Sequence, residues 1–336
     1  MGALTTTTQV HDILDKWASR KLIMVAKPKL VHASVAQKGD MPQGNGRTAV
    51  YRKYAALATT GVVLAQLQET VPPAGEALSK SDKEVTLGQW GNYATLSDMV
   101  EYTVRDKLMR IAVERLGRQS GQVIDKLLRD KIVAGSQVRY GGGVASRALV
   151  GGTSSTFNTD DIRVIVRTLQ RNDAEYFESM IMASTKIDTK PIRPSFVGTL
   201  HPDNYRDIDE EAGFIPVANY SAQTAVHPAE IGYLHHVRWL STTHTKVWAD
   251  AGTTHGGTVS TSGTNSDVYG NMVFAPNAVG DVPLQGRSME NIIHRRGSGG
   301  VGDPVNQRAT VGWKHTGARL ILEDLFMVRY ECNATA

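Results

Sequence analysis

The stretch SDMVEYTVRDKLMRIAVERLGRQSGQVIDKLLRDKIV, Ser97 to Val133, decides how the rest of the chain is interpreted. Its apolar residues recur at steps of three and four, which predicts one amphipathic helix. The members of that apolar face are Val104, Leu108, Ile111, Ala112, Leu116, Val123, Ile124, Leu127 and Leu128. Asp98, with Glu101 three residues later, is a capping signal, and Gly135 follows the last apolar residue. The pattern therefore predicts a single helix over 97–133, about 55 Å long at 1.5 Å per residue.

The other face of this helix is charged. Four acid-to-base pairs stand at i,i+4 and predict a solvated side, namely Glu101–Arg105, Asp106–Arg110, Glu114–Arg118 and Asp125–Arg129. A coiled coil is the alternative, but Gly117 and Gly121 interrupt any heptad seam. Two glycines four residues apart indicate either a slight bend or the close approach of another backbone.

Composition limits the class of protein. The chain has 336 residues, 41% hydrophobic and 21% charged, which is enough for one large or two medium domains. No apolar run is long enough to span a bilayer and no signal peptide is visible, so we expect a product that stays in the cytosol where it is made. The single cysteine, Cys332, excludes an intramolecular disulfide framework.

Residues 1–46 read as an N-terminal arm with an excess of positive charge. They hold six basic residues against three Asp, a balance of +3, so only +1 of the net charge of +4 belongs to everything after residue 46. The basic residues are Lys16, Arg20, Lys21, Lys27, Lys29 and Lys38. Two interpretations stay open: the arm faces a polyanion such as DNA, or its lysines pair with acidic groups of a neighbouring subunit.

Residues 47–96 predict a long two-stranded finger. TAVYRKY alternates like a strand up to Tyr54, and KEVTLGQWGNY alternates again over Lys83–Tyr93. The residues between them, Leu57 to Asp82, are polar and broken by Pro and Gly, and predict a mobile tip. Because an isolated hairpin is marginal in water, the finger needs a partner surface. Its candidate contact residues are Arg52, Lys53, Glu69, Glu76, Lys80 and Lys83.

No motif predicts catalysis, a cofactor or a metal site. Gly297, Gly299 and Gly302 match G-x-G-x-x-G, but Asp303 and Pro304 follow instead of a helix. His235 and His236 invite a zinc hypothesis. In a strand, however, they would point to opposite faces, and no carboxylate or Cys stands at ligand spacing. Two ordinary histidines explain the pair.

The order of the parts, together with several blocks of sequence, resembles the Hong Kong 97-like capsid proteins of tailed phages, in the branch typified by coliphage N-four. The blocks are VTLGQWGNYATLSD, FVGTLHPDNYRDI, HPAEIGYLHHVRWLST, DVYGNMVFAP and DPVNQRATVGWKHTGARLI, which span most of residues 83–322. The resemblance implies an α+β fold with an N-terminal arm (1–46), an E-loop (47–96), a peripheral domain with the spine helix (97–155, helix 97–133), a mainly axial domain (156–287) and returning peripheral strands (288–336).

The function implied by this resemblance is mechanical. Many copies would form the pentamers and hexamers of an icosahedral head around double-stranded DNA, in a virion assembled in the cytoplasm of a bacterial host. Some relatives carry a scaffolding domain of about a hundred residues ahead of the arm. The shorter segment here implies a separate scaffolding protein or a trimmed form, besides a portal, possible decoration proteins, non-specific contact with DNA and no membrane. A cellular nanocompartment shell is the alternative with the same fold, and a metabolic enzyme is the alternative from another class.

Overall fold

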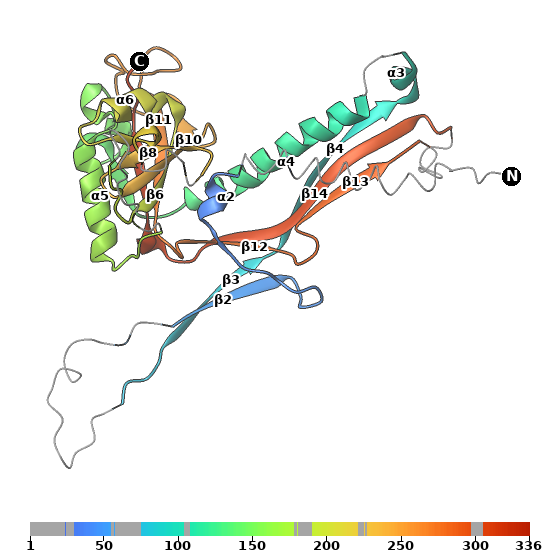
Figure 1. Ribbon diagram of the computed structural model, residues 1–336, viewed down its shortest axis with the longest axis horizontal. Coiled ribbons are helices and arrows are strands. Elements are labelled where there is room, and N and C mark those ends of the chain that lie inside the picture. The colour runs from blue at the N-terminus through green and yellow to red at the C-terminus, as the bar shows by residue number, and fades with distance from the viewer. Residues whose placement is uncertain are drawn as a thin grey trace.

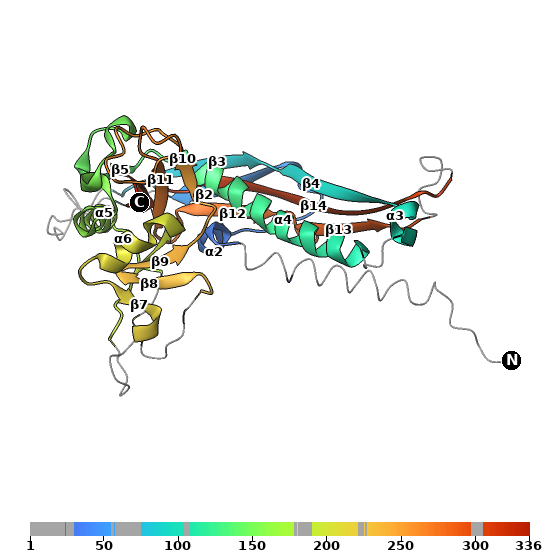
Figure 2. The ribbon, with the colours of Figure 1, turned by 90° about the horizontal axis from the view of Figure 1, so that it is seen from above.

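The computed structural model describes residues 24, 30–54, 57, 75–103, 108–177, 180, 190–220, 225, 227–296 and 305–336. Two bodies are joined end to end, an elongated one built from a long sheet with one helix along it and a compact one that holds the C-terminus (Figure 1). A pair of strands, β2 and β3, projects away from both bodies. Seen from above, helix α4 and the strands β4, β14 and β13 extend together away from the compact body (Figure 2).

The elongated body is organised around β14 (Arg308–Ile321), which at about 3.4 Å per residue spans roughly 48 Å. One edge of β14 pairs with β4 (Gly88–Ser97), and the other pairs with β13 (Met289–His294) and then β12 (Val279–Pro283), all antiparallel. The short β1 (Gln37–Lys38) adds in parallel to β12, so part of the arm completes this sheet.

Helix α4 (Leu108–Ile132) covers one face of that sheet. Its Val113 and Leu116 pack against Val311 and Trp313 of β14. Gly117 and Gly121 are both buried, which agrees with the interpretation of a close approach. The buried set of the helix is Val113, Leu116, Gly117, Ser120, Gly121, Ile124, Asp125, Leu128 and Ile132.

The predicted single helix is confirmed only in part. The structure gives α3 (Asp98–Thr103) and α4 as separate helices, and residues 104–107 between them lie outside the described residues. At 1.5 Å per residue the 25 described residues of α4 span about 38 Å of the predicted 55 Å. The Ser97 hydroxyl accepts a hydrogen bond from the Val100 amide at 3.4 Å, while Asp98 binds only the adjacent amide of Met99, so Ser97 caps α3.

The compact body contains an eight-stranded mixed sheet. Its order is β5 (Val138–Tyr140), β15 (Met327–Cys332), β11 (Val268–Phe274), β6 (Phe196–Leu200), β9 (Val237–Ser241), β8 (Glu230–Leu234) and β7 (Ile215–Pro216), with β10 (Lys246–Trp248) also paired to β11. Every residue of β6 and β11 is buried, which is typical of strands covered on both faces.

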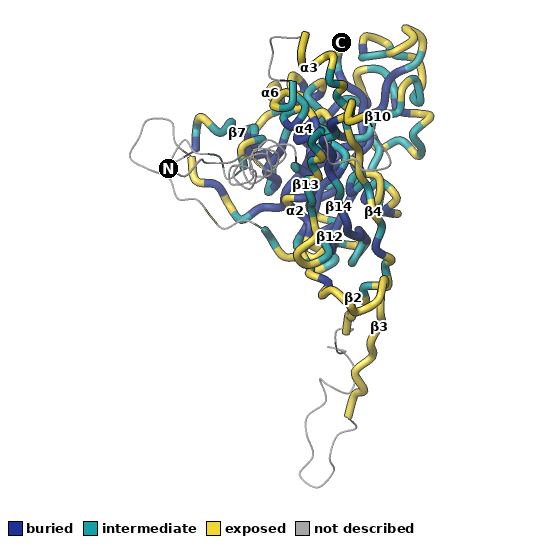
Figure 3. Tube along the Cα trace, turned by 90° about the vertical axis from the view of Figure 1, so that its right-hand side faces the viewer, coloured by how far each residue is buried: buried dark blue, intermediate teal, exposed yellow. Residues whose placement is uncertain are grey.

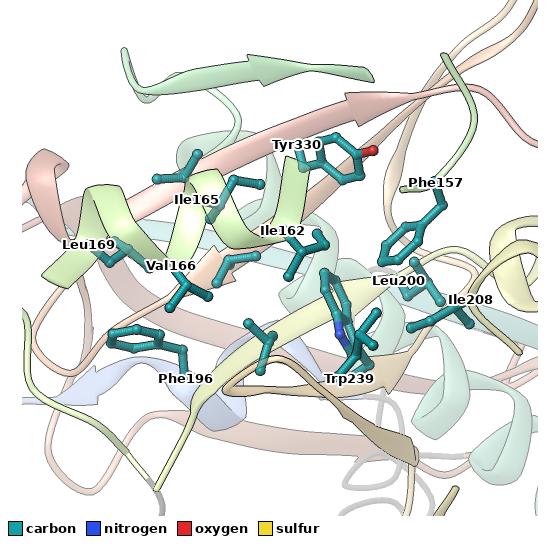
Figure 4. Close-up of a cluster of buried hydrophobic side chains, with 14 of the residues drawn as sticks. Phe157, Ile162, Ile165, Val166, Leu169, Phe196, Leu200, Ile208, Trp239 and Tyr330 are labelled. Atoms are coloured by element: carbon teal, nitrogen blue, oxygen red, sulfur yellow. The ribbon is translucent and has the colours of Figure 1, made fainter. Parts of the chain in front are cut away.

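Helix α5 (Thr159–Arg171) seals one face of this sheet, and Figure 4 shows its apolar side chains directed into the core. The Asn158 side chain caps the helix by accepting the Asp160 amide at 2.7 Å. Phe157 meets Trp239 edge to face at 5.2 Å between ring centroids. Full burial of each large aliphatic side chain contributes about 1.5–3 kcal/mol to the stability of the folded protein.

The remaining elements of the two bodies are short. They are α2 (His32–Val35), α6 (Tyr205–Glu210) and the 3-10 turns Gly141–Gly143, Arg147–Leu149, Thr153–Ser155, Pro202–Asn204, Val217–Asn219 and Asp324–Phe326.

The two bodies share a second apolar core at their junction. It combines Val31 and Val35 of the arm, Leu128 and Ile132 at the end of α4, and Phe274 of β11. Because the arm, the helix and both sheets contribute to one cluster, the arm segment around α2 is an integral part of the fold.

Three expectations about strands are wrong. The apolar pattern of GYLHHVRWLST predicts one strand, but β8 and β9 form a hairpin there, with His235 and His236 at φ of 42° and 64° as its two turn residues. The two apolar runs of ATVGWKHTGARLILEDLFMVRYE predict a pair of strands, but they form β14 and β15, which lie in different sheets. The strand expected over Lys83–Tyr93 is β3 (Lys80–Thr86) followed by β4, separated by the buried Leu87.

At two points the strands do not follow the domain ranges that the resemblance implied. β12 falls inside 156–287 but belongs to the sheet of the elongated body. β15 falls inside 288–336 but belongs to the sheet of the compact body. The C-terminal segment therefore crosses from one body to the other after β14.

Candidate assembly surfaces

The finger is the most exposed ordered element of the described chain. β2 (Thr48–Tyr54) pairs antiparallel with β3 from Thr48↔Thr86 to Tyr54↔Lys80, as the alternating patterns predicted. Most of its residues are exposed, and Val50 and Tyr54 are 50% and 56% exposed (Figure 3), whereas Ala49, Tyr51 and Val85 pack against an apolar cluster of the long sheet. A two-stranded ribbon is marginal by itself, so its exposed part gains stability only from what it contacts. Most of the predicted tip, residues 58–74, lies outside the described residues.

The charged residues predicted for the finger have mixed surroundings. Arg52 pairs with Asp82 across the ribbon at 3.2 Å, and Lys80 lies 3.7 Å from the same carboxylate. Lys53 forms an ion pair with Glu323, and the Lys83 ammonium donates to the Ile321 carbonyl at 3.4 Å. The contacts of Lys53 and Lys83 therefore attach the base of the finger to the rest of its own chain. Glu76 also has an interaction within the chain, and Glu69 lies outside the described residues.

A buried polar cluster holds the base of the finger against the sheet. Arg319 on β14 contacts Asp281 on β12 at 3.2 Å and lies over the Trp90 ring at 5.0 Å. The Arg319 guanidinium also meets His315, and burial together with that positive charge lowers the pKa of His315 to about 4. Burial raises the pKa of Tyr51 on β2, and the Asp281 carboxylate adds to the rise.

The neighbouring part of the arm contributes a positive charge to the same cluster. Lys38 stands opposite Asp281 in the parallel register of β1 and β12. Burial raises the pKa of Asp281, while the charges of Arg319 and Lys38 act in the opposite direction. Lys38 is therefore engaged electrostatically within its own chain. The other predicted arm residues, Lys16, Arg20, Lys21, Lys27 and Lys29, lie outside the described residues.

The arm is anchored by a buried carboxylate that sequence reasoning missed. Asp125 of α4 accepts the His32 amide at 2.8 Å and the His32 Nδ1 at 2.7 Å, and it also lies 3.4 Å from the Nδ1 of His244. Because a carboxylate only accepts hydrogen bonds, both imidazoles must carry a proton on Nδ1. Burial would raise the pKa of Asp125, but the hydrogen bonds from His244 and His32 outweigh it and lower the pKa to about 2.

The predicted Asp125–Arg129 surface pair is therefore wrong. Arg129 instead binds Asp130 at 2.7 Å and the His244 carbonyl at 2.9 Å. The two histidines stand 93 and 119 residues from Asp125, so no local spacing could indicate the contact. The available signal was the position of Asp125 itself, between Ile124 and Leu128 on the apolar side of the helix.

The distal end of the elongated body exposes apolar side chains. Met99, Tyr102 and Tyr93 are 64%, 72% and 69% exposed, and Val305 is 71% exposed. Arg296 lies over the Tyr102 ring at 4.7 Å, a cation–π contact that leaves the remainder of the ring free to meet another surface. Apolar groups gathered far from the core mark a surface suited to a protein contact.

Of the chemical sites weighed from the sequence, only the metal hypothesis falls on described residues. Over the described ranges, no three His, Cys, Asp or Glu side chains are grouped in a way that could hold a metal ion. The glycine-rich stretch 297–304 lies entirely outside those ranges. Among the helices that the structure describes, none is long and apolar enough to cross a membrane.

No protein-family model matches the sequence, and no curated protein matches it. Solved structures do match the fold. The capsid of Ralstonia phage GP4 aligns with a TM-score of 0.66 at 14% identity, covering 90% of this chain and 88% of that chain. The head structure of Helicobacter pylori bacteriophage KHP40 aligns at 0.59 and 10% identity, covering 90% and 91%.

A third structure, the capsid asymmetric unit of cyanophage Pam1, aligns with a TM-score of 0.53 at 15% identity and covers 88% and 87% of the two chains. None of the three tests the resemblance to the coliphage N-four branch, which stays a prediction. Since the alignments take in both bodies, the likeness concerns the architecture as a whole. The chain has the Hong Kong 97-like fold of tailed-phage capsid proteins.

Proposed function

We propose that the chain is the major capsid protein of a tailed bacteriophage, and that its copies assemble as pentamers and hexamers into the icosahedral head that encloses double-stranded DNA. The observation that carries the proposal is the match to phage capsid and head structures over about 90% of the chain. The exposed finger supports it, because a ribbon without its own core is explained by contact with a neighbouring subunit. We propose the virion capsid as its location, after assembly in the cytoplasm of the bacterial host.

In this proposal the elongated body is the peripheral domain, the compact body the axial domain, and β2–β3 the E-loop. A separate scaffolding protein, a portal and decoration proteins are the further partners that the resemblance implies. A cellular nanocompartment would use the same fold, but the three matching structures are capsids or heads of phages. A metabolic enzyme has no support from any cluster of side chains described above.

Shortening the finger tests the proposal. Tyr54 and Lys80 are directly paired, so replacing residues 55–79 with Asn-Gly closes β2 and β3 with a two-residue hairpin turn. We expect the variant to be a soluble, folded subunit that forms no closed shells, as judged by circular dichroism and electron microscopy.

A matched control keeps the finger at full length and changes its exposed apolar residues, Val50→Ser with Tyr54→Ser. We expect this control to form fewer shells than wild type without loss of the fold. Closed shells in wild-type yield from the shortened variant would contradict the role given to the finger. A wild-type protein that stays monomeric under every assembly condition would contradict the capsid function.

A further inference from the structure

The exposed side of α4 carries cations that the fold does not use. The helix buries one side against β14 and β4, and Arg115, Arg118 and Lys126 are exposed on the opposite side. With 100° per residue, Arg115 and Lys126 point within about 20° of each other, and Arg118 lies about 60° to one side. These three side chains therefore form one stripe, which we call the α4 basic stripe.

The acids of α4 do not neutralise this stripe. Glu114 lies 3.9 Å from Arg110, Asp130 binds Arg129 at 2.7 Å, and Asp125 is buried against the two histidines. Within the described residues, none of the three cations of the stripe takes part in an ion pair. Because exposed like charges on one helix face repel one another, their arrangement contributes nothing to the stability of the isolated subunit.

We infer that the α4 basic stripe contacts the phosphate backbone of double-stranded DNA inside the assembled head. Arg115 and Lys126 are eleven residues apart, about 16 Å along a rigid helix axis, a length over which a DNA strand presents several phosphates. Lys and Arg contacts to phosphate carry no sequence information, which suits a shell protein that meets every part of a genome. Gln122 lies between the cations on the same side and adds an uncharged donor.

This inference rests on the proposed capsid function and assigns one surface within it. The charge complementarity favours a polyanion over an apolar partner, since the exposed side holds two guanidinium groups and an ammonium group. An acidic surface on a neighbouring subunit is the competing occupant. The two occupants differ in one respect: only contact with DNA leaves the assembly of empty shells unaffected.

The test compares two double variants that remove the same charge. Arg115→Gln with Arg118→Gln alters the stripe, and Arg167→Gln with Arg171→Gln removes two exposed arginines from α5. DNA-filled heads of wild type and both variants are irradiated, and peptides with nucleotide adducts are identified by mass spectrometry. DNA release on heating is then followed between about 50 and about 200 mM salt, the range in which phosphate contacts weaken strongly.

We expect wild-type heads to give adducts on peptides from 108–132. The stripe variant should form empty shells in wild-type yield, lose those adducts, and release DNA at a lower temperature, with a difference that shrinks as salt rises. The α5 variant should behave as wild type.

Three results overturn the inference: no adducts on α4 in wild-type heads, equal effects of both double variants, or loss of empty shells in the stripe variant alone, which would assign the stripe to a subunit contact. Failure of wild type to form shells would instead refute the capsid function.

Discussion

Removing the carboxylate that anchors the arm should destabilise the subunit strongly. Asp125→Ala leaves the His32 amide, the His32 imidazole and the His244 imidazole without their acceptor in a fully buried site. Breaking a buried pair by removing one partner typically costs about 3–5 kcal/mol, because the remaining polar groups lose their water and gain nothing. We expect a loss in that range, with the largest effect on the segment around α2.

The same interaction should make the stability of the protein depend on pH. The pKa of Asp125 is about 2 in the folded protein against an ordinary 3.8, a difference of about 1.8 units. At about 1.4 kcal/mol per unit this is roughly 2–3 kcal/mol of stability. Because the folded pKa is the lower one, the contribution is fully present above pH 3.8 and is lost as the pH falls toward 2. Asp125→Asn should abolish this part of the acid sensitivity.

Urea denaturation of the purified subunit, followed by tryptophan fluorescence, measures these free energies of unfolding. Asp130→Ala, an exposed carboxylate on the same helix, is the matched control and should change stability by no more than about 0.5 kcal/mol. A double-mutant cycle should give a larger coupling of Asp125 to His32, at 2.7 Å, than to His244, at 3.4 Å. Equal losses in Asp125→Ala and Asp130→Ala would refute the argument.

Three further changes probe the backbone. Leu116→Pro, on the buried side of α4, should lower the free energy of unfolding by about 3 kcal/mol or more and leave no soluble folded protein on expression. A normal yield would contradict the packing of that helix. His236→Gly, at a φ of 64°, should raise the melting temperature by relieving up to about 1 kcal/mol of left-handed backbone strain, and a lower melting temperature would count against the hairpin turn. Gly91→Ala places a Cβ 2.6 Å from the Trp313 carbonyl and should lower the free energy of unfolding, measured by urea denaturation, by about 1–3 kcal/mol. Gly75→Ala, with open space around it, is the control and should leave that free energy unchanged.

The elements that the sequence predicted correctly are those whose side chains repeat at a regular spacing. The alternating stretch Thr48–Tyr54 is a strand of the finger. The core of the long helix is present as α4. In each of these segments the apolar side chains recur at a regular spacing, so a short window contains the information needed.

The errors arise where a distant partner decides the outcome. Asp125 looked like half of a surface pair because His32 and His244 cannot be associated with it from the sequence. His235 and His236 looked like strand residues because a two-residue turn normally contains Gly or Asn, and here two histidines adopt its positive φ angles. β14 and β15 looked paired because neighbouring apolar runs often are, although one lies in each sheet.

The distribution of exposed apolar side chains links the fold to assembly. Most of those described lie on the finger or at the distal end of the elongated body, whereas the two cores at the junction and in the compact body are closed. A monomeric enzyme would gain nothing from apolar groups at the extremities farthest from its core. In the proposed shell these extremities would be the parts that reach other copies, so the proposal accounts for their exposure in one chain.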